Sequence, residues 1–337
     1  MNRFAASSGK APLLDLRSVS RRFSRPLDLA AKIARALGSR QKEQVVHAVD
    51  DVSLSVHEGE VLGLVGESGC GKSTLGRMMA GILSPSEGKI LYRGMDVNTL
   101  SPEQRREADL KIQMIFQDPF ASLNPRYRVR DIIGEAPRVH RVVPAKEKDA
   151  FLDGIMLKVG LDPEYGQRYP HQFSGGQRQR IGIARALAVR PECIVCDESV
   201  AALDVSIQAQ IINLFIRLRE ELNLTYVFIS HDISVVEHIS DRVVVMYLGR
   251  VVESADTEEL FARPAHPYTH ALLREVPRLD SRHQSFRPVS GEIPSPLNPP
   301  RGCHFHPRCE RAMPICREQA PVLREIVPGH QAACHLL

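Results

Sequence analysis

A glycine-rich loop between an apolar run and a helical pattern constrains the fold of this chain more than any other feature. The run Val61–Val65 has the length and composition of a buried strand. It leads into Gly66–Ser73, which matches the pattern G-x-x-x-x-G-K-S, and then into a predicted helix over Leu75–Ile82. Glycines let backbone N–H groups turn toward phosphate oxygens, and the helix N-terminus adds partial positive charge. This order of elements predicts an α/β fold that binds a nucleotide.

Each polar residue of the loop has a predicted task. The ammonium group of Lys72 suits the β- and γ-phosphates, and the Ser73 hydroxyl suits Mg²⁺. We expect the whole segment to contact the nucleotide: Gly66, Glu67, Ser68, Gly69, Cys70, Gly71, Lys72, Ser73 and Thr74. A chance match to this pattern is the alternative, and the flanking strand and helix argue against it.

Strands and helices alternate along much of the remaining chain. Such alternation predicts a largely parallel sheet covered by helices on both faces. The expected strands are Leu13–Val19, Val46–Val56, Lys111–Phe116, Cys193–Cys196, Thr225–Ile229 and Arg242–Tyr247. The expected helices are Val205–Leu222 and Ile233–Ile239, and residues from about 126 to 188 read mainly as helix. Proline and glycine become frequent after Ser281, so we expect the tail to be irregular or stapled by a metal.

Four polar side chains follow predicted strands. Asp197 ends one strand and suits Mg²⁺, and Glu198, one residue on, suits activation of a water. Gln117 follows another strand and suits a metal or water, while His231 suits a γ-phosphate. The alternatives are a helix cap for the two acids, a solvated glutamine and a structural histidine.

A second phosphate-facing surface is predicted far from the loop. Ser174, Gly175, Gly176 and Gln177 open an apolar-periodic run that reads as a helix. They lie too far along the chain to belong to the first loop. Without the other motifs, such a segment would usually be a flexible turn.

Composition narrows the class of protein. The net charge of +4 over 337 residues, without a long basic run, argues against a nucleic-acid partner. No stretch approaches the roughly 18–20 apolar residues of a membrane helix, so we expect a cytoplasmic chain whose membrane role requires partners. Four cysteines gather in the tail, and a cytoplasmic cluster of this kind favours a metal over disulfides. They are Cys303, Cys309, Cys316 and Cys334.

The motifs together resemble the nucleotide-binding subunit of an ABC transporter. The resemblance runs from about Leu13 to Ala255 and rests on the loop, Gln117, Ser174–Gln177, Asp197–Glu198, Leu203–Asp204 and His231. Three further segments resemble the oligopeptide/dipeptide permease ATPases: Gln117–Arg126, His266–Leu273 and Gly302–Cys309. The segment Lys72–Arg77 is more similar to the second of the two ATPases that usually work as a pair.

The resemblance implies a fold and its division. Residues 1–255 would form a P-loop ABC ATPase domain, with a RecA-like core, an antiparallel β subdomain and a helical subdomain over about 126–188. Residues 256–337 would form a small Cys-rich C-terminal extension. A basic segment over about 26–42 is an insertion, which reads as a surface helix or as a contact with lipid or a membrane partner.

The resemblance also implies an activity. The chain would bind and hydrolyse ATP with Mg²⁺ and energise import of di- or oligopeptides. Each ATP would lie between the loop of one subunit and the Ser174–Gln177 segment of another, with Glu198 as general base, Lys72, Gln117 and His231 assisting, and Phe23 stacked on adenine. A plain core role is the alternative for Phe23.

Partners and alternatives follow from the same resemblance. The partners would be a paralogous second ABC ATPase, two permease subunits at the cytoplasmic face of the membrane and an extracytoplasmic peptide-binding protein. A [4Fe–4S] cluster on the tail cysteines is implied, with zinc or no metal as alternatives. Another cargo, such as nickel or a sugar, or a soluble ABC-type ATPase of DNA or ribosome metabolism, stays open.

Overall fold

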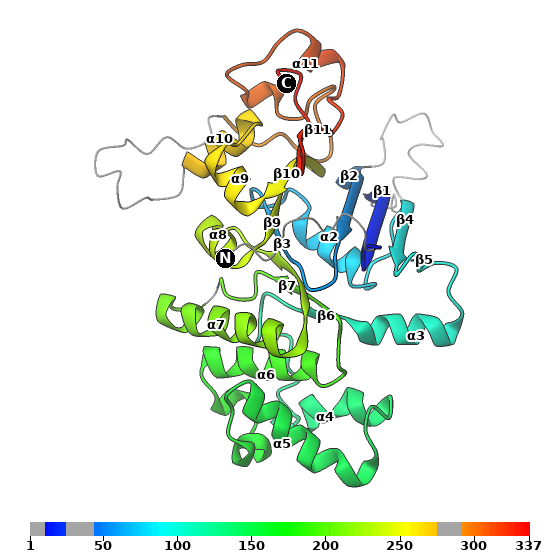
Figure 1. The fold of residues 1–337 in the computed structure, drawn as a ribbon, viewed down its shortest axis with the longest axis vertical. Helices are drawn as coiled ribbons and strands as arrows, with labels where there is room; N and C mark the ends of the chain where they lie inside the picture. Colours follow the sequence, from blue (N-terminus) through cyan, green and yellow to red (C-terminus); the bar gives the residue numbers. More distant parts are fainter. Residues whose placement is uncertain (1–10, 25–43, 202, 275–290) are drawn as a thin grey trace, which may run out of the picture.

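The computed structural model describes residues 11–24, 44–201, 203–274 and 291–337. The basic segment predicted over 26–42 lies outside these residues. Figure 1 shows a central sheet, a group of helices at one end of the molecule and the C-terminal residues at the other end.

A mixed eight-stranded sheet forms the core, in the order β11-β12-β10-β9-β3-β8-β7-β6. The strands β9, β3, β8, β7 and β6 pair in parallel, which confirms the predicted parallel sheet. Their bounds are β3 Val61–Val65, β6 Ile112–Ile115, β7 Cys193–Asp197, β8 Thr225–Ile229 and β9 Arg242–Tyr247. The strand β10 (Arg250–Asp256) pairs antiparallel with β9.

A second sheet is antiparallel, in the order β2-β1-β4-β5. Its strands are β1 Leu14–Ser24, β2 Val45–Val56, β4 Glu87–Tyr92 and β5 Met95–Asp96. The two sheets share one apolar core with α2 (Lys72–Met79), into which Leu62 and Leu64 of β3 point. Val61 and Val65, at the alternate positions of β3, belong to the core on the other face of the sheet, as the two-residue period of a strand requires.

Helices cover that other face. They are α7 Val205–Leu222, α8 Ile233–Ile239, α9 Thr257–Ala262 and α10 Pro267–Arg274. The helical subdomain contains α4 Val129–Val139, α5 Lys148–Lys158 and α6 Gly175–Leu187, within the stretch predicted to be mainly helical. One further helix, α3 (Pro102–Lys111), precedes β6.

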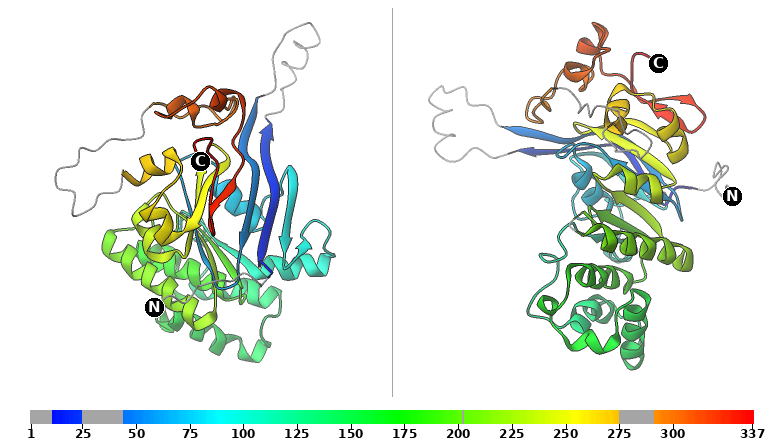
Figure 2. Two further views of the ribbon diagram at one scale, coloured as in Figure 1. Left: turned by 45° about the horizontal axis from the view of Figure 1, so that its top comes forward. Right: turned by 90° about the vertical axis from the view of Figure 1, so that its left-hand side faces the viewer.

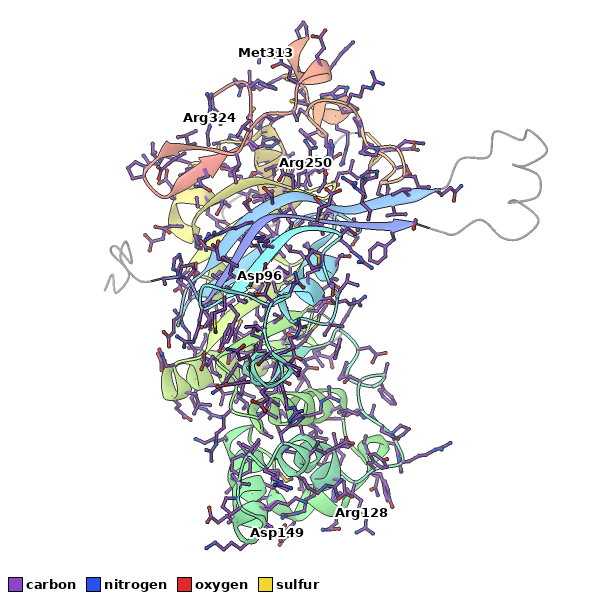
Figure 3. The ribbon with its side chains drawn as sticks, turned by 90° about the vertical axis from the view of Figure 1, so that its right-hand side faces the viewer. Asp96, Arg128, Asp149, Arg250, Met313 and Arg324 are labelled. Carbon is purple, nitrogen blue, oxygen red and sulfur yellow. The ribbon has the colours of Figure 1, made fainter. Side chains whose placement is uncertain are left out.

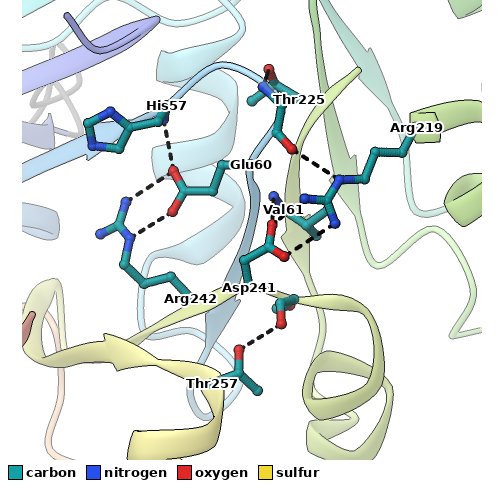
Figure 4. Close-up of polar contacts among 10 residues, drawn as sticks. His57, Glu60, Val61, Arg219, Thr225, Asp241, Arg242 and Thr257 are labelled. Atoms are coloured by element: carbon teal, nitrogen blue, oxygen red, sulfur yellow. Dashed lines mark hydrogen bonds and ion pairs between the residues drawn. The ribbon is translucent and has the colours of Figure 1, made fainter. Parts of the chain in front are cut away.

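Ion pairs connect side chains at the amino ends of the central strands (Figure 4). Arg242 Nε lies 2.7 Å from Glu60 Oε1, and Arg219 Nη2 lies 2.6 Å from Asp241 Oδ2. The same Asp241 oxygen accepts the backbone N–H of Val61 at 2.8 Å. These charged side chains therefore join the starts of β3 and β9, and the carboxyl edge of the sheet is left for other polar groups.

The tail is less irregular than its composition predicted. Its strands β12 (His330–Ala332) and β11 (Arg324–Val327) extend the core sheet, because β12 pairs with β10. The two views in Figure 2 show the tail against the end of this sheet. In Figure 3, Met313 and Arg324 of the tail lie at the opposite end of the molecule from Arg128 and Asp149 of the helical subdomain.

A buried pair attaches the tail to the core. His330 Nε2 lies 2.7 Å from Glu253 Oε1, and both side chains are almost completely removed from solvent. Glu253 also accepts the backbone N–H groups of Ala265 and His266, at 2.6 and 2.9 Å. One carboxylate therefore connects β10, β12 and the start of α10.

We predict that His266 makes the stability of the fold depend on pH. Its Nδ1 accepts the N–H of Tyr268 at 3.0 Å at the start of α10, and burial lowers its pKa to about 4. The unfolded histidine binds a proton below about pH 6.5, whereas the folded one does not until about pH 4. Stability from this group is therefore full above pH 6.5 and falls by about 2 kcal/mol between pH 7 and pH 5.

Urea unfolding of the parent protein and of His266→Asn, each at pH 7 and at pH 5, measures this loss of the free energy of unfolding. Asparagine keeps a hydrogen-bond acceptor and does not titrate, so the variant should lose about 2 kcal/mol less than the parent on acidification. Equal losses in the two proteins would show that His266 is not the group responsible.

Candidate nucleotide site

The predicted phosphate loop lies between β3 and α2. Gly66 has φ 149° and Gly71 has φ 106°, both outside the conformations that other residues readily adopt. A Cβ atom at Gly66 would lie 2.2 Å from the carbonyl oxygen of Met246, and one at Gly71 would lie 2.1 Å from that of Ala48. The loop is therefore pressed against β9 and β2, and only glycine fits at these two positions.

Lys72 lies inside the curve of the loop. Its Nζ donates to the carbonyl oxygens of Gly66 at 2.6 Å and Glu67 at 3.1 Å, and the residue is 4% exposed. A fixed cation at this point suits the phosphate role predicted for Lys72.

Ser73 and Asp197 meet where α2 begins and β7 ends. The Ser73 hydroxyl donates to Asp197 Oδ1 at 2.7 Å, and Asp197 is 3% exposed. Burial raises the pKa of Asp197, although the hydrogen bond from Ser73 opposes the shift. Two adjacent hard oxygen donors are the type that Mg²⁺ prefers, so the pair fits the predicted metal role.

Glu198 brings the remaining predicted side chains together. Gln117 Nε2 donates to Glu198 Oε2 at 2.7 Å, and His231 Nδ1 lies 3.5 Å from the same oxygen. The Glu198 backbone has φ 45°, which is uncommon outside glycine and clusters at functional sites. Its N–H donates to the carbonyl oxygen of Ile229 in β8 at 3.0 Å, which fixes the turn. Three strands therefore bring their terminal polar groups to one carboxylate.

The Ser174–Gln177 segment does form a helix start. Ser174 Oγ accepts the N–H of Gln177 at 3.4 Å, and Gln177 Oε1 accepts the N–H of Ser174 at 3.0 Å, which is a capping box. Ser174 and Gly175 are exposed, and α6 packs on α4, α5, α7 and β6. The segment thus belongs to the helical subdomain and faces solvent, while the phosphate loop joins β3 to α2 of the core.

Phe23 is 40% exposed at the end of β1, with the Arg21 guanidinium 4.8 Å from its ring centroid. It lies opposite Val46 of β2, two residues before Ala48, whose carbonyl meets Gly71 of the loop. An exposed aromatic ring on this side of the loop supports the stacking role over the core role.

The four tail cysteines influence one another but do not form a metal site in the described part of the chain. Burial, together with the three other tail cysteines, raises the pKa of Cys303 to about 11. Within residues 11–24, 44–201, 203–274 and 291–337, no group of three or more His, Cys, Asp or Glu side chains is placed to hold a metal ion. The geometry therefore does not support the implied [4Fe–4S] cluster.

Two residues that contact the loop were not predicted from the sequence. The Tyr268 hydroxyl accepts the N–H of Glu67 at 2.9 Å, and Arg308 Nη1 lies 2.6 Å from Glu67 Oε2. Both belong to segments that carried the narrower resemblance, His266–Leu273 and Gly302–Cys309. No local pattern signals a contact across 241 residues of sequence.

Family models match two parts of the chain. Residues 49–201 match the ABC transporter model, and residues 252–316 match the model for the C-terminal region of oligopeptide/dipeptide transporters. The first match contains the loop, Gln117, Ser174–Gln177 and Glu198. The second contains Tyr268 and Arg308.

Curated relatives are similar over most of their length. The oligopeptide transport ATP-binding protein AppF of Bacillus subtilis is 56% identical over 86% of this chain and 90% of its own. The dipeptide transport ATP-binding protein DppF of Haemophilus influenzae is 50% identical over 87% of this chain and 90% of its own.

Solved structures share the fold. One is cbiO1 of Clostridium perfringens, described as part of the ABC transporter complex cbiONQ, with TM-score 0.61 and 27% identity over 75% of this chain and 92% of that chain. Another is the dimeric ABC transporter cassette MJ0796, with TM-score 0.60 and 26% identity over 72% of this chain and 98% of that chain.

These findings agree with the geometry of the site and with the predicted ATPase fold. None of the helices in the described part of the chain combines the length and apolar composition that crossing a membrane requires. The chain belongs to the ABC transporter ATP-binding proteins of the oligopeptide/dipeptide transporter family.

Proposed function

We propose that this chain hydrolyses ATP to energise import of di- or oligopeptides through a membrane permease. The observation that carries the proposal is the convergence of Lys72, the Ser73–Asp197 pair and the Gln117–Glu198–His231 group at one edge of the sheet. The peptide cargo is supported by the relatives at 50–56% identity, which are an oligopeptide and a dipeptide transport ATP-binding protein. Nickel or a sugar as cargo remains the alternative, and transport assays with the permease in vesicles would decide between them.

The chemistry assigned to the site is in-line attack of water on the γ-phosphate. Glu198 accepts the proton of the water, and Gln117 and His231 orient its carboxylate. Lys72 and the loop N–H groups bind and orient the phosphates. Ser73 and Asp197 would hold Mg²⁺, which neutralises phosphate charge when bound.

Completion of the site by a second ATPase subunit is part of the proposal. Ser174 and Gly175 present an exposed helix N-terminus, which suits the γ-phosphate of a nucleotide held by another subunit. The dimeric form of MJ0796 supports this arrangement. The partner is a paralogous ATPase or a second copy of this chain.

Permease subunits and a peptide-binding protein complete the proposed complex at the cytoplasmic face of the membrane. A groove of about 620 Å³ between α3 and α4 supports a docked permease segment. Its lining includes Arg105, Leu110, Ala136, His140 and Val189. The lining comes both from α3, which precedes β6 of the core sheet, and from α4 of the helical subdomain.

We predict that Glu198→Gln separates binding from hydrolysis. The amide keeps the size of the side chain but cannot accept a proton, so phosphate release should fall at least about 100-fold. Nucleotide affinity should stay within about threefold, and the ATP-closed dimer should accumulate. Parent-like phosphate release would remove Glu198 from the role of general base.

We predict that Ser174→Arg blocks the pairing of two subunits, whereas Lys72→Ala blocks the earlier step of ATP binding. A bulky arginine at the exposed helix start should block ATP-dependent pairing and hydrolysis, while a single subunit still binds ATP. Lys72→Ala should lose ATP binding itself, because its cation is removed from the loop. Calorimetry for binding and light scattering for pairing distinguish them. Loss of ATP binding in Ser174→Arg would argue against the composite site.

The [4Fe–4S] cluster stays a prediction from the resemblance and plays no part in this mechanism. The arrangement of the tail cysteines in the described part of the chain does not support it. Iron content and visible absorption of anaerobically purified protein test it. Absence of iron and of a broad visible band would contradict it.

A further inference from the structure

The phosphate loop carries an acid that is held by the far end of the chain. Glu67 is the second residue of the loop, and both of its carboxylate oxygens accept hydrogen bonds from Arg308. Arg308 Nη1 lies 2.6 Å from Oε2 and Nη2 lies 2.9 Å from Oε1. The side chain of Arg308 is 3% exposed and that of Glu67 is 19% exposed. A buried, bidentate pair of this kind has a well-defined geometry.

The backbone of Glu67 is held from the same direction. Its N–H donates to the hydroxyl of Tyr268, which is fully buried. The Tyr268 ring packs on Tyr247, with centroids 4.7 Å apart, and on Phe305, with centroids 5.3 Å apart. Phe305 starts the short 3-10 turn that carries Arg308, whose N–H donates to the Phe305 carbonyl at 3.0 Å. A rigid aromatic group therefore sets the position of both contacts.

Charge gives this arrangement a consequence for the nucleotide. A carboxylate in a loop that holds phosphates repels them, and the repulsion is strong where water is excluded. Arg308 neutralises Glu67, the second residue of the predicted phosphate loop. Lys72 Nζ donates to the Glu67 carbonyl at 3.1 Å, so a shift of Glu67 would also move the loop lysine.

We propose that Arg308 is a positioning residue for ATP binding, which acts by neutralising Glu67 and fixing the phosphate loop. The inference rests on the proposed ATP site and extends it to the C-terminal region. That region is then part of the nucleotide site, because a loop without it would hold an uncompensated acid.

A purely structural role is the competing explanation. The tail has a separate attachment, the buried pair of His330 and Glu253. Among the described residues, this pair makes no hydrogen bond or ion pair with Glu67 or Lys72. His330→Ala is therefore a matched control, since it should weaken the attachment of the tail without changing the charge at the loop.

The test is calorimetric binding of Mg-ADP to the full chain, with the thermal midpoint of each variant. Arg308→Met should raise the Kd about tenfold, because Glu67 becomes an unpaired acid. Glu67→Gln added to Arg308→Met should restore at least threefold of that loss, because the acid itself is gone. His330→Ala should lower the thermal midpoint and leave the Kd within twofold.

The results distinguish a failure of the proposed ATP site from a failure of the role proposed for Arg308. Failure of the parent to bind Mg-ADP would contradict the proposed ATP site. A parent that binds, with an unchanged Kd in Arg308→Met or no recovery in the double variant, would overturn the role of Arg308. If Arg308→Met does not fold, Arg308→Gln with and without Glu67→Gln supplies the comparison, since glutamine keeps a polar side chain but removes the charge that neutralises Glu67.

Discussion

The parallel pairing of β3, β8, β7 and β6 is the constraint on which the rest of the structure depends. Parallel strands send their carboxyl ends to one edge of the sheet, and this pairing is continuous from β3 to β6. Each of these strands ends next to a polar segment of the site. The phosphate loop follows β3, His231 follows β8, Asp197 and Glu198 end β7, and Gln117 follows β6. One hydrogen-bonding pattern thus assembles groups that are spread along the sequence from Gly66 to His231.

The opposite edge shows why charge alone does not identify a site. Glu60, Arg242, Arg219 and Asp241 are also charged and partly buried, but they satisfy one another at the amino ends of the strands. At the carboxyl edge, Glu198 sits on a strained backbone and shares its carboxylate with side chains from two other strands. Placement at a particular end of the sheet distinguishes the two sets.

The C-terminal region belongs to the same physical unit as the core. Its strands extend the core sheet, the buried Glu253–His330 pair attaches it, and Arg308 and Tyr268 reach the loop. Of these contacts, those of Arg308 and Tyr268 connect the C-terminal region directly to the geometry of the loop. The strands β11 and β12 were not predicted, because they are short and the sequence of the tail is rich in proline and glycine.

The sequence by itself determined the local chemistry and much of the fold. Strands such as Thr225–Ile229 and helices such as Val205–Leu222 occur with their predicted bounds, since continuous apolar runs and helical periodicity are local signals. The loop motif likewise specified which residues suit phosphate. Only the tertiary structure decided that Glu198 meets Gln117 and His231 and that Arg308 pairs with Glu67. It also decided that Ser174 is exposed at the start of a helix in the helical subdomain. These depend on strand order and on contacts between distant segments, and no periodicity within a short window of sequence encodes them.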